Sequence, residues 1–274
     1  MVEQVTSGIS YFTTAAGVEL LLGRLGLYRY APHLHDTFVV GAVSSGVATL
    51  SIDGRVHHPR VGQLVLCNPL EVHDGSALSG DVVYRSSFPS TAFLQDVVTD
   101  GRPGSRTRPV RFPVSVVDDP VGAAMFHRAH EVSRRGDCAL EAEERLVETY
   151  AYCLARHAGV RTAGAGRTAG PVGRAVTLLS DRYADRITLA DLVAEAGVPR
   201  HRLITAFRRQ VGLTPHAYLV SRRTVAAKAL LRGGEKSSDV AARTGFADQA
   251  HLTRTFKAHF GVTPGAYQQA VRAR

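Results

Sequence analysis

One pattern of apolar and polar positions occurs twice in the last hundred residues of the chain. The first copy runs from Leu189 to Leu219 and the second from Ser238 to Gln268. From Leu203 onward the copies match at a constant offset of 49 residues, and both contain the sequence Gly-x-Thr-Pro. Such an internal repeat predicts that one structural unit is used twice.

Each copy predicts two helices joined by a tight turn. In the first copy, apolar residues at helical spacing stop at Gly197 and resume at Leu203, and in the second copy Gly245 marks the turn. This arrangement can place the second helix of each pair in the DNA major groove. A long helix over about Pro215–Arg232 is expected to hold the two second helices about one DNA turn apart, ~34 Å. Its predicted apolar side comprises Tyr218, Leu219, Arg222, Val225, Ala226, Ala229 and Leu230.

The second helix of each copy carries cationic, amide and hydroxyl side chains on its predicted outer face. Arg, Gln and Thr can read base edges, and Arg and Lys can also hold phosphate. A solvated charged face is the alternative for a single helix, but its duplication favours DNA reading. The residues concerned are Arg200, His201, Thr205, Arg208 and Arg209 in the first copy, and Gln249, Ala250, His251, Thr253, Arg254 and Lys257 in the second.

Residues 171–274 resemble the DNA-binding domain of the AraC/XylS family of bacterial transcription regulators. The resemblance rests on GLTPHAYLVSRRTVAAKALL (212–231) and DVAARTGFADQAHLTRTFKAHFGVTPGAY (239–267). It implies base contacts by His201, Ile204 and Thr205 from the first unit, and by Gln249, Ala250, His251, Thr253 and Arg254 from the second. Thr205 and Ala250 stand where the family often has longer polar residues. The family also implies RNA polymerase as a partner and activation more than repression.

Charge is distributed as this interpretation requires. The net charge is +9, and residues 171–274 hold 17 Lys and Arg against 7 Asp and Glu, whereas residues 1–170 hold 16 against 17. A basic excess confined to the C-terminal part predicts double-stranded DNA as the partner of that part. The three cysteines lack CxxC spacing and are expected to be reduced thiols, mostly buried. With no signal peptide or membrane-length apolar run, a cytoplasmic location is expected.

Short apolar or alternating runs fill the N-terminal half after a polar arm over residues 1–17. They predict a small antiparallel barrel or sandwich. The runs are Val18–Leu22, Gly26–Tyr30, Phe38–Ser44, Val47–Ile52, Val56–His58, Gln63–Cys67 and Val82–Phe88. Residues 31–75 resemble the cupin-like effector barrel of AraC-type regulators through His33-x-His35, three glycines and Asn68-Pro69-x-Glu71-x-His73. A glycine is usual where Leu70 stands, so a differently bent turn is expected there.

Three histidines form the main candidate for ligand binding in this barrel. Metal-binding cupins combine His-x-His with a nearby Glu and a distant His, but here the expected carboxylate is missing, because Asp36 points away by strand alternation. We therefore expect no metal and no cofactor, and histidines at a barrel mouth that contact a small-molecule effector. The candidate effector ligands are His33, His35 and His73, with Arg24, Tyr28 and Tyr11 as further candidates.

Two helices, 119–135 and 140–157, are predicted after the barrel, with an Asp-Asp-Pro start and a glutamate-rich first turn, respectively. They form either a homodimer contact or a cap on the barrel. The Gly- and Ala-rich stretch 159–170 predicts a flexible linker. The expected fold is thus α+β and multidomain: a cupin-like barrel with two helices over 1–158, then an all-α domain with two helix-turn-helix units over 171–274.

These features predict an effector-controlled, sequence-specific transcription regulator with no catalytic residues and no membrane partner. Two alternatives remain open. One is a metal-dependent cupin enzyme tethered to DNA, against which the missing carboxylate speaks. The other is a ligand-independent architectural DNA-binding protein, whose affinity would follow salt but ignore sequence.

Overall fold

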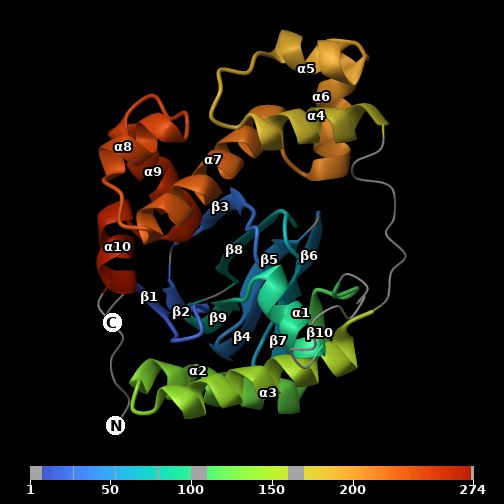
Figure 1. Cartoon of the computed structure of the whole chain (residues 1–274). Helices are drawn as coiled ribbons and strands as arrows, with labels where there is room; N and C mark the ends of the chain where they lie inside the picture. The colour runs from blue at the N-terminus through green and yellow to red at the C-terminus, as the bar shows by residue number, and fades with distance from the viewer. Residues whose placement is uncertain are drawn as a thin grey trace.

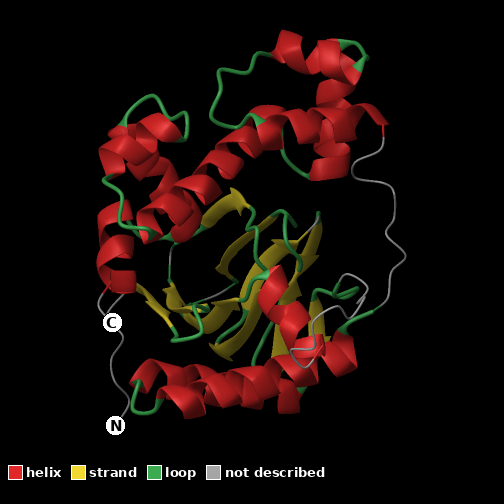
Figure 2. Ribbon diagram, in the orientation of Figure 1, coloured by secondary structure: helices red, strands yellow, loops and turns green. Residues whose placement is uncertain are grey.

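The computed structural model describes residues 8–26, 28–52, 54–78, 80–99, 110–159 and 170–272. A β-rich N-terminal part is followed by a helix pair, and an all-helical C-terminal part lies across the opposite side of the sheets (Figure 1). Helices and strands are thus segregated along the chain, which confirms the predicted α+β class (Figure 2). Except for its two ends, the predicted linker 159–170 lies outside the described residues.

Two sheets form the N-terminal part, and every pairing among the described strands is antiparallel. One sheet has the order β1-β2-β9-β4-β7-β10 and the other β3-β8-β5-β6. The sheets enclose apolar residues between them without closing, so the predicted barrel is an open, cupin-like pair of sheets. The strands are β1 Ile9–Thr13, β2 Glu19–Leu25, β3 Tyr30–His33, β4 Val39–Ser45, β5 Ala48–Ile52, β6 Arg55–His57, β7 Gln63–Cys67, β8 His73–Ala77, β9 Val82–Phe88 and β10 Val116–Asp118.

Some strand predictions were wrong at the N-terminal end. Residues expected to form a polar arm instead make β1, which pairs with β2 and buries Tyr11 and Phe12. Among the described residues of the predicted strand Gly26–Tyr30, only Tyr30 lies in a strand, because β3 starts there. Two further elements, β8 and the helix α1 (Thr91–Thr99), were not predicted. β8 reads His-Asp-Gly-Ser-Ala and lacks the β-branched residues that mark a strand in a sequence.

The predicted helix pair, α2 (Pro120–Arg135) and α3 (Ala139–His157), packs on one face of the six-stranded sheet. Asp119 caps α2 by accepting a hydrogen bond from the Gly122 amide, with Pro120 at the first helical position. Buried Phe126 and Tyr150 meet sheet residues such as Leu20 and Leu64 in one apolar cluster. Among described residues the pair therefore covers one face of this sheet, formed by Leu20, Val40, Leu64 and Leu66.

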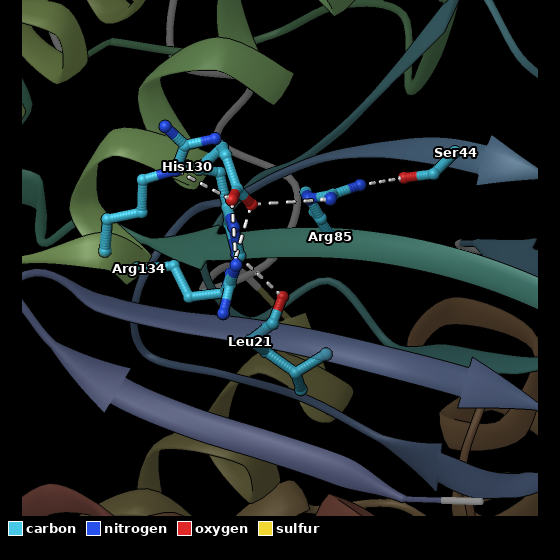
Figure 3. A network of polar contacts seen from close by, with 7 residues as sticks. Leu21, Ser44, Arg85, His130 and Arg134 are labelled. Atoms are coloured by element: carbon cyan, nitrogen blue, oxygen red, sulfur yellow. Dashed lines mark hydrogen bonds and ion pairs between the residues drawn. The ribbon is translucent and has the colours of Figure 1, made fainter. Parts of the chain in front are cut away.

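A polar network on the sheet side of α2 fixes its position (Figure 3). His130 Nε2 lies 3.0 Å from the Leu21 carbonyl oxygen of β2. Burial lowers the pKa of His130 to about 3, so the ring is neutral and donates to that carbonyl. Arg85 of β9 donates to Ser44 and also faces Glu131 at 3.8 Å, which in turn accepts from Arg134 at 2.8 Å. α2 and three strands are thus joined by directional contacts as well as by apolar packing.

The C-terminal part repeats its local structure as the sequence repeat predicted. Gly212 and Gly261 end their helices in the left-handed conformation, with φ of 81° and 76°. Thr214 and Thr263 then cap the following helices by accepting from backbone amides at 3.1 and 3.2 Å. The helices are α4 Gly170–Asp181, α5 Leu189–Ala196, α6 Arg200–Val211, α7 Pro215–Arg232, α8 Ser237–Arg243, α9 Gln249–Phe260 and α10 Pro264–Arg272.

The connecting helix α7 differs from its predicted apolar face in its second half. Ala229 is exposed, whereas Ala227 and Leu231 are buried. The first half of α7 packs with α4, α5 and α6, and its second half packs with α8, α9 and the N-terminal sheets. Because the helix has partners on two different sides, a single stripe of apolar spacing could not describe it.

Candidate DNA-reading helices and effector cavity

The predicted DNA-reading side chains occupy the outer faces of α6 and α9. In α6, Leu203 and Phe207 are fully buried, and in α9 Leu252 and Phe256 are. This inward anchoring leaves Arg200, His201, Thr205, Arg208 and Arg209 exposed on α6 and Ile204 half-buried. On α9 it leaves Gln249, Ala250, Arg254 and Lys257 exposed and His251 and Thr253 half-buried. Both faces are therefore exposed, and both helices end at a glycine in the left-handed conformation.

A cavity of about 100 Å³ lies between the two sheets, and its wall is mostly apolar. Both sheets contribute, and so does α9, through its last two residues His259 and Phe260. The polar part of the wall includes Tyr11, Tyr30 and Tyr84 together with the three predicted histidines. Tyr30 and Tyr84 were not predicted, although Tyr30 stands at the end of a predicted strand. Their hydroxyl oxygens are hydrogen-bonded to each other at 2.6 Å.

The structure brings four of the six predicted effector ligands to this cavity, namely Tyr11, His33, His35 and His73. The other two lie elsewhere. Arg24 forms an ion pair with Asp81, and Tyr28 donates its hydroxyl proton to the Lys257 carbonyl of α9. Tyr28 therefore contacts α9, the second predicted DNA-reading helix, instead of the cavity wall.

The three histidine rings form one cluster. His33 and His73 are paired opposite one another on β3 and β8, and their ring centroids lie 4.5 Å apart. The His35 centroid lies 5.0 Å from that of His33 and 5.1 Å from that of His73. Burial lowers the pKa of all three, and for His33 and His35 their neighbouring histidines lower it further. The cluster is therefore neutral at physiological pH.

The turn that carries Asn68 and Pro69 positions this cluster. Leu70 has φ of 63°, the only left-handed residue other than glycine in the described part of the chain, so it adopts a backbone conformation that glycine adopts most readily. Its amide donates to the His35 carbonyl at 2.7 Å. Such a conformation is unfavourable for leucine by ~1–2 kcal/mol, and strain of this kind is common at binding sites.

Sequence reasoning missed a buried ionic cluster where the C-terminal part meets the sheets. Glu19 of β2 is fully buried and forms an ion pair with Lys228. Its Oε2 atom also accepts hydrogen bonds from Arg232 and from the Tyr267 hydroxyl, each at 2.6 Å. Burial raises the pKa of Glu19, but the two cations outweigh this effect and lower it below its usual value. The Lys228 ammonium also lies 4.6–5.3 Å from four aromatic ring centroids. The available signal was the charged Glu19 within the otherwise apolar run Val18–Leu22.

The comparisons with known proteins agree with this architecture. The model of the AraC-like ligand binding domain matches residues 15–149, and a helix-turn-helix domain model matches residues 192–270. The two matched regions occur in the order that the sequence predicted, and together they span most of the chain. The chain belongs to the AraC family of transcription regulators.

Several relatives of this AraC-family chain match over most of their length. The HTH-type transcriptional regulator YbfI of Bacillus subtilis (strain 168) is 27% identical over 228 residues, covering 82% of each chain. The HTH-type transcriptional activator RhaS of Escherichia coli O81 (strain ED1a) is 22% identical and covers 97% of each. Fatty-acid-bound ToxT from Vibrio cholerae has the same fold, with a TM-score of 0.58 at 14% identity, covering 94% of this chain and 96% of ToxT. None of the described helices is long and apolar enough to cross a membrane.

A matched pair of glycine substitutions tests whether α9 is packed against the sheets. Gly212→Ala and Gly261→Ala both place a side chain at positive φ, which should cost ~1–2 kcal/mol. A Cβ at Gly261 would also lie 2.0 Å from Ile9 Cδ1 and 3.1 Å from the Tyr30 hydroxyl, whereas at Gly212 the nearest atom is 3.8 Å away. We expect Gly261→Ala to lower the melting temperature more than Gly212→Ala in thermal unfolding. Equal losses would contradict tight packing at Gly261.

Proposed function

We propose that this protein is a sequence-specific transcription regulator whose DNA binding is controlled by a small molecule in the cavity between the sheets. One observation carries the proposal: α9 holds both the predicted DNA-reading residues and part of the cavity wall. Its exposed residues from Gln249 to Lys257 form the predicted DNA-reading face, and its last two residues, His259 and Phe260, form part of the cavity wall. Occupancy of the cavity can therefore change the position of a DNA-reading helix without any long relay.

The size and lining of the cavity narrow the class of effector. At about 100 Å³ it is smaller than an engineered cavity of ~150 Å³ that accepts benzene. A larger effector can enter only if part of the wall moves, and Phe260 belongs to a helix end rather than to a sheet. We expect a mostly apolar molecule with one polar group facing the tyrosines or histidines. The fold relative ToxT has been solved with an unsaturated fatty acid bound, which supports this class.

Several finer aspects belong to the same proposal. We expect activation, as in the relative RhaS, with RNA polymerase as a partner. A homodimer through α2 and α3 is also expected, where Val121 and Leu140 leave apolar side chains exposed. We also expect three segments: a sheet domain over 1–158, a linker over 159–170 and a DNA-binding domain over 171–274. A protein of this kind acts in the cytoplasm and has no catalytic activity.

The decisive experiment is selection of fragmented genomic DNA by the purified protein at moderate salt, followed by sequencing. We expect a few loci that share a motif of two boxes about one helical turn apart. Retention spread evenly over the genome would instead indicate an architectural DNA-binding protein. A set of candidate apolar ligands can then be tested for a change in affinity for the recovered sites.

Arg254→Ala tests the reading face of α9 on a recovered site. Arg254 is exposed and near the middle of the helix, so its removal should leave the fold intact. Loss of a base contact should weaken specific binding by ~1–3 kcal/mol, measured by fluorescence anisotropy, with relaxed preference at one base pair. Arg55→Ala, which removes an exposed arginine from β6, is the control and should bind like the unaltered protein. Unchanged affinity in Arg254→Ala would remove this residue from the interface.

A further inference from the structure

The histidine cluster has nitrogen atoms that converge without partners of their own. One ring nitrogen from each of His33, His35 and His73 can be chosen so that all three lie within 4.8 Å of one another. His33 and His35 are less than 8% exposed. Among the described residues, no hydrogen bond to the His35 ring is found, and none joins the three rings. Neutral imidazoles that present lone pairs to one another in a buried site are unfavourable unless something shared satisfies them.

The backbone fixes which nitrogens are available. His33 Nδ1 lies 2.7 Å from the Ala31 carbonyl oxygen, and His73 Nδ1 lies 2.9 Å from the Glu71 carbonyl oxygen. A carbonyl oxygen only accepts, so each Nδ1 carries the proton and each Nε2 keeps a free lone pair. Histidines that bind metals almost always donate their other ring nitrogen in this way. Both rings therefore have the orientation and the tautomer of metal ligands.

We propose that His33, His35 and His73 bind one divalent late transition-metal ion through three ring nitrogens, with the remaining coordination position open to the cavity. In a tetrahedral zinc site with Zn–N of about 2.0–2.1 Å the nitrogens are ~3.3 Å apart, so each ring needs to move by less than ~1 Å from its present place. An all-imidazole set suits Zn²⁺, Cu²⁺, Ni²⁺ or Co²⁺ and not Mg²⁺ or Ca²⁺. The proposal goes beyond effector control of DNA binding and does not depend on it.

The carboxylate that metal-binding cupins have a few residues after His-x-His is missing here, and Glu71 does not take its place in the structure. Glu71 is buried, but its carboxylate accepts from the Asn68 amide and side chain at 2.9 and 2.8 Å and from Arg111 at 3.0 Å. It therefore holds the turn before His73 and does not enter the cluster. Three neutral nitrogens leave the full positive charge of the ion uncompensated, so the open position favours an anionic or water-derived fourth ligand. His259 of α9 stacks on His33 with ring centroids 5.8 Å apart, which places the site beside the DNA-reading helix.

The test is a titration of the full chain, free of any affinity tag and freed of metal with a chelator, with Zn²⁺ in calorimetry. We expect one ion per chain, and a loss of affinity of 100-fold or more in His33→Ala and in His73→Gln. His58→Ala removes an exposed histidine outside the cluster and should leave the affinity unchanged; this control matters because the chain has 12 histidines. Co²⁺ in place of Zn²⁺ should give visible absorption bands of a four- or five-coordinate nitrogen site, absent from His33→Ala.

Two outcomes would overturn the proposal. The first is no stoichiometric binding at micromolar Zn²⁺, which would leave the histidines as effector contacts only. The second is binding that persists in both cluster variants or disappears in His58→Ala, which would place the ion on the surface. Circular dichroism of each variant detects any loss of fold. His73→Gln keeps a polar side chain at this position so that the variant is more easily accommodated by the fold. No DNA is used, so the result is separate from the proposed regulatory function.

Discussion

Replacing Glu19 with alanine should destabilise the protein by ~3–5 kcal/mol, because it leaves the largely buried Lys228 ammonium without its counter-charge. Arg232 is 44% exposed at its side chain and can turn toward solvent, but Lys228 is surrounded by aromatic rings and cannot. Denaturant unfolding followed by circular dichroism measures the loss. Glu148→Ala provides the control, since Glu148 pairs with Arg145 at an exposed site where such pairs contribute less than about 1 kcal/mol.

A second variant separates the lost charge from lost packing. Replacing both Glu19 and Lys228 with methionine removes the buried pair and keeps apolar volume, and it should recover most of the stability. The effect also depends on pH. Since the pKa of Glu19 is lower in the folded protein than in the unfolded chain, its contribution is present above the usual carboxyl pKa and is lost as pH falls through the folded value. The difference between the unaltered protein and Glu19→Ala should therefore shrink below about pH 4. A constant difference down to pH 2 would contradict the ion pair.

The helix-turn-helix units could be predicted because their determinants are local. Gly212 with Thr214, and Gly261 with Thr263, stop one helix and cap the next within four residues, and the repeat doubles each signal. The reading faces follow, since the inward positions of a short helix define its outward positions. His33 and His73 were likewise predicted together, but only through a family resemblance, because 40 residues separate them.

Contacts between the two parts of the chain could not be predicted in the same way. Glu19 and Lys228 are 209 residues apart, and each is flanked by apolar residues that fit a strand or a helix equally well without the other. The same holds for the final turn of α9. Apolar spacing places Phe260 in the core of its own helical unit, and only the fold reveals that it also faces a cavity between the sheets. The proposed control of DNA binding depends on these contacts, so the regulatory part of the function was the hardest part to predict from the sequence.

Phe260→Ala should show how strongly α9 and the sheets depend on each other. Phe260 is 1% exposed and contacts Phe256 within its own unit, His35 across the cavity and the Lys228 ammonium. Removal of a fully buried phenylalanine ring costs about 3–5 kcal/mol. Phe260 contacts residues of its own helical unit and residues of the sheets. We therefore expect faster amide hydrogen exchange in α9 and also in β3, which α9 contacts, and in β1, which α10 contacts.

Phe207→Ala is the matched control for this experiment. Phe207 is equally buried, but its ring contact is to Tyr218 within the first helical unit. Its loss should speed exchange in α5, α6 and α7 and leave β1 and β3 unchanged, at a similar total loss of stability. Local opening of this kind is resolved by hydrogen exchange with mass spectrometry, which assigns the change to peptides. If β1 and β3 also remain protected from exchange in Phe260→Ala, the end of α9 does not stabilise the sheets. An effector in the cavity would then have to change the position of the DNA-reading helices through other contacts.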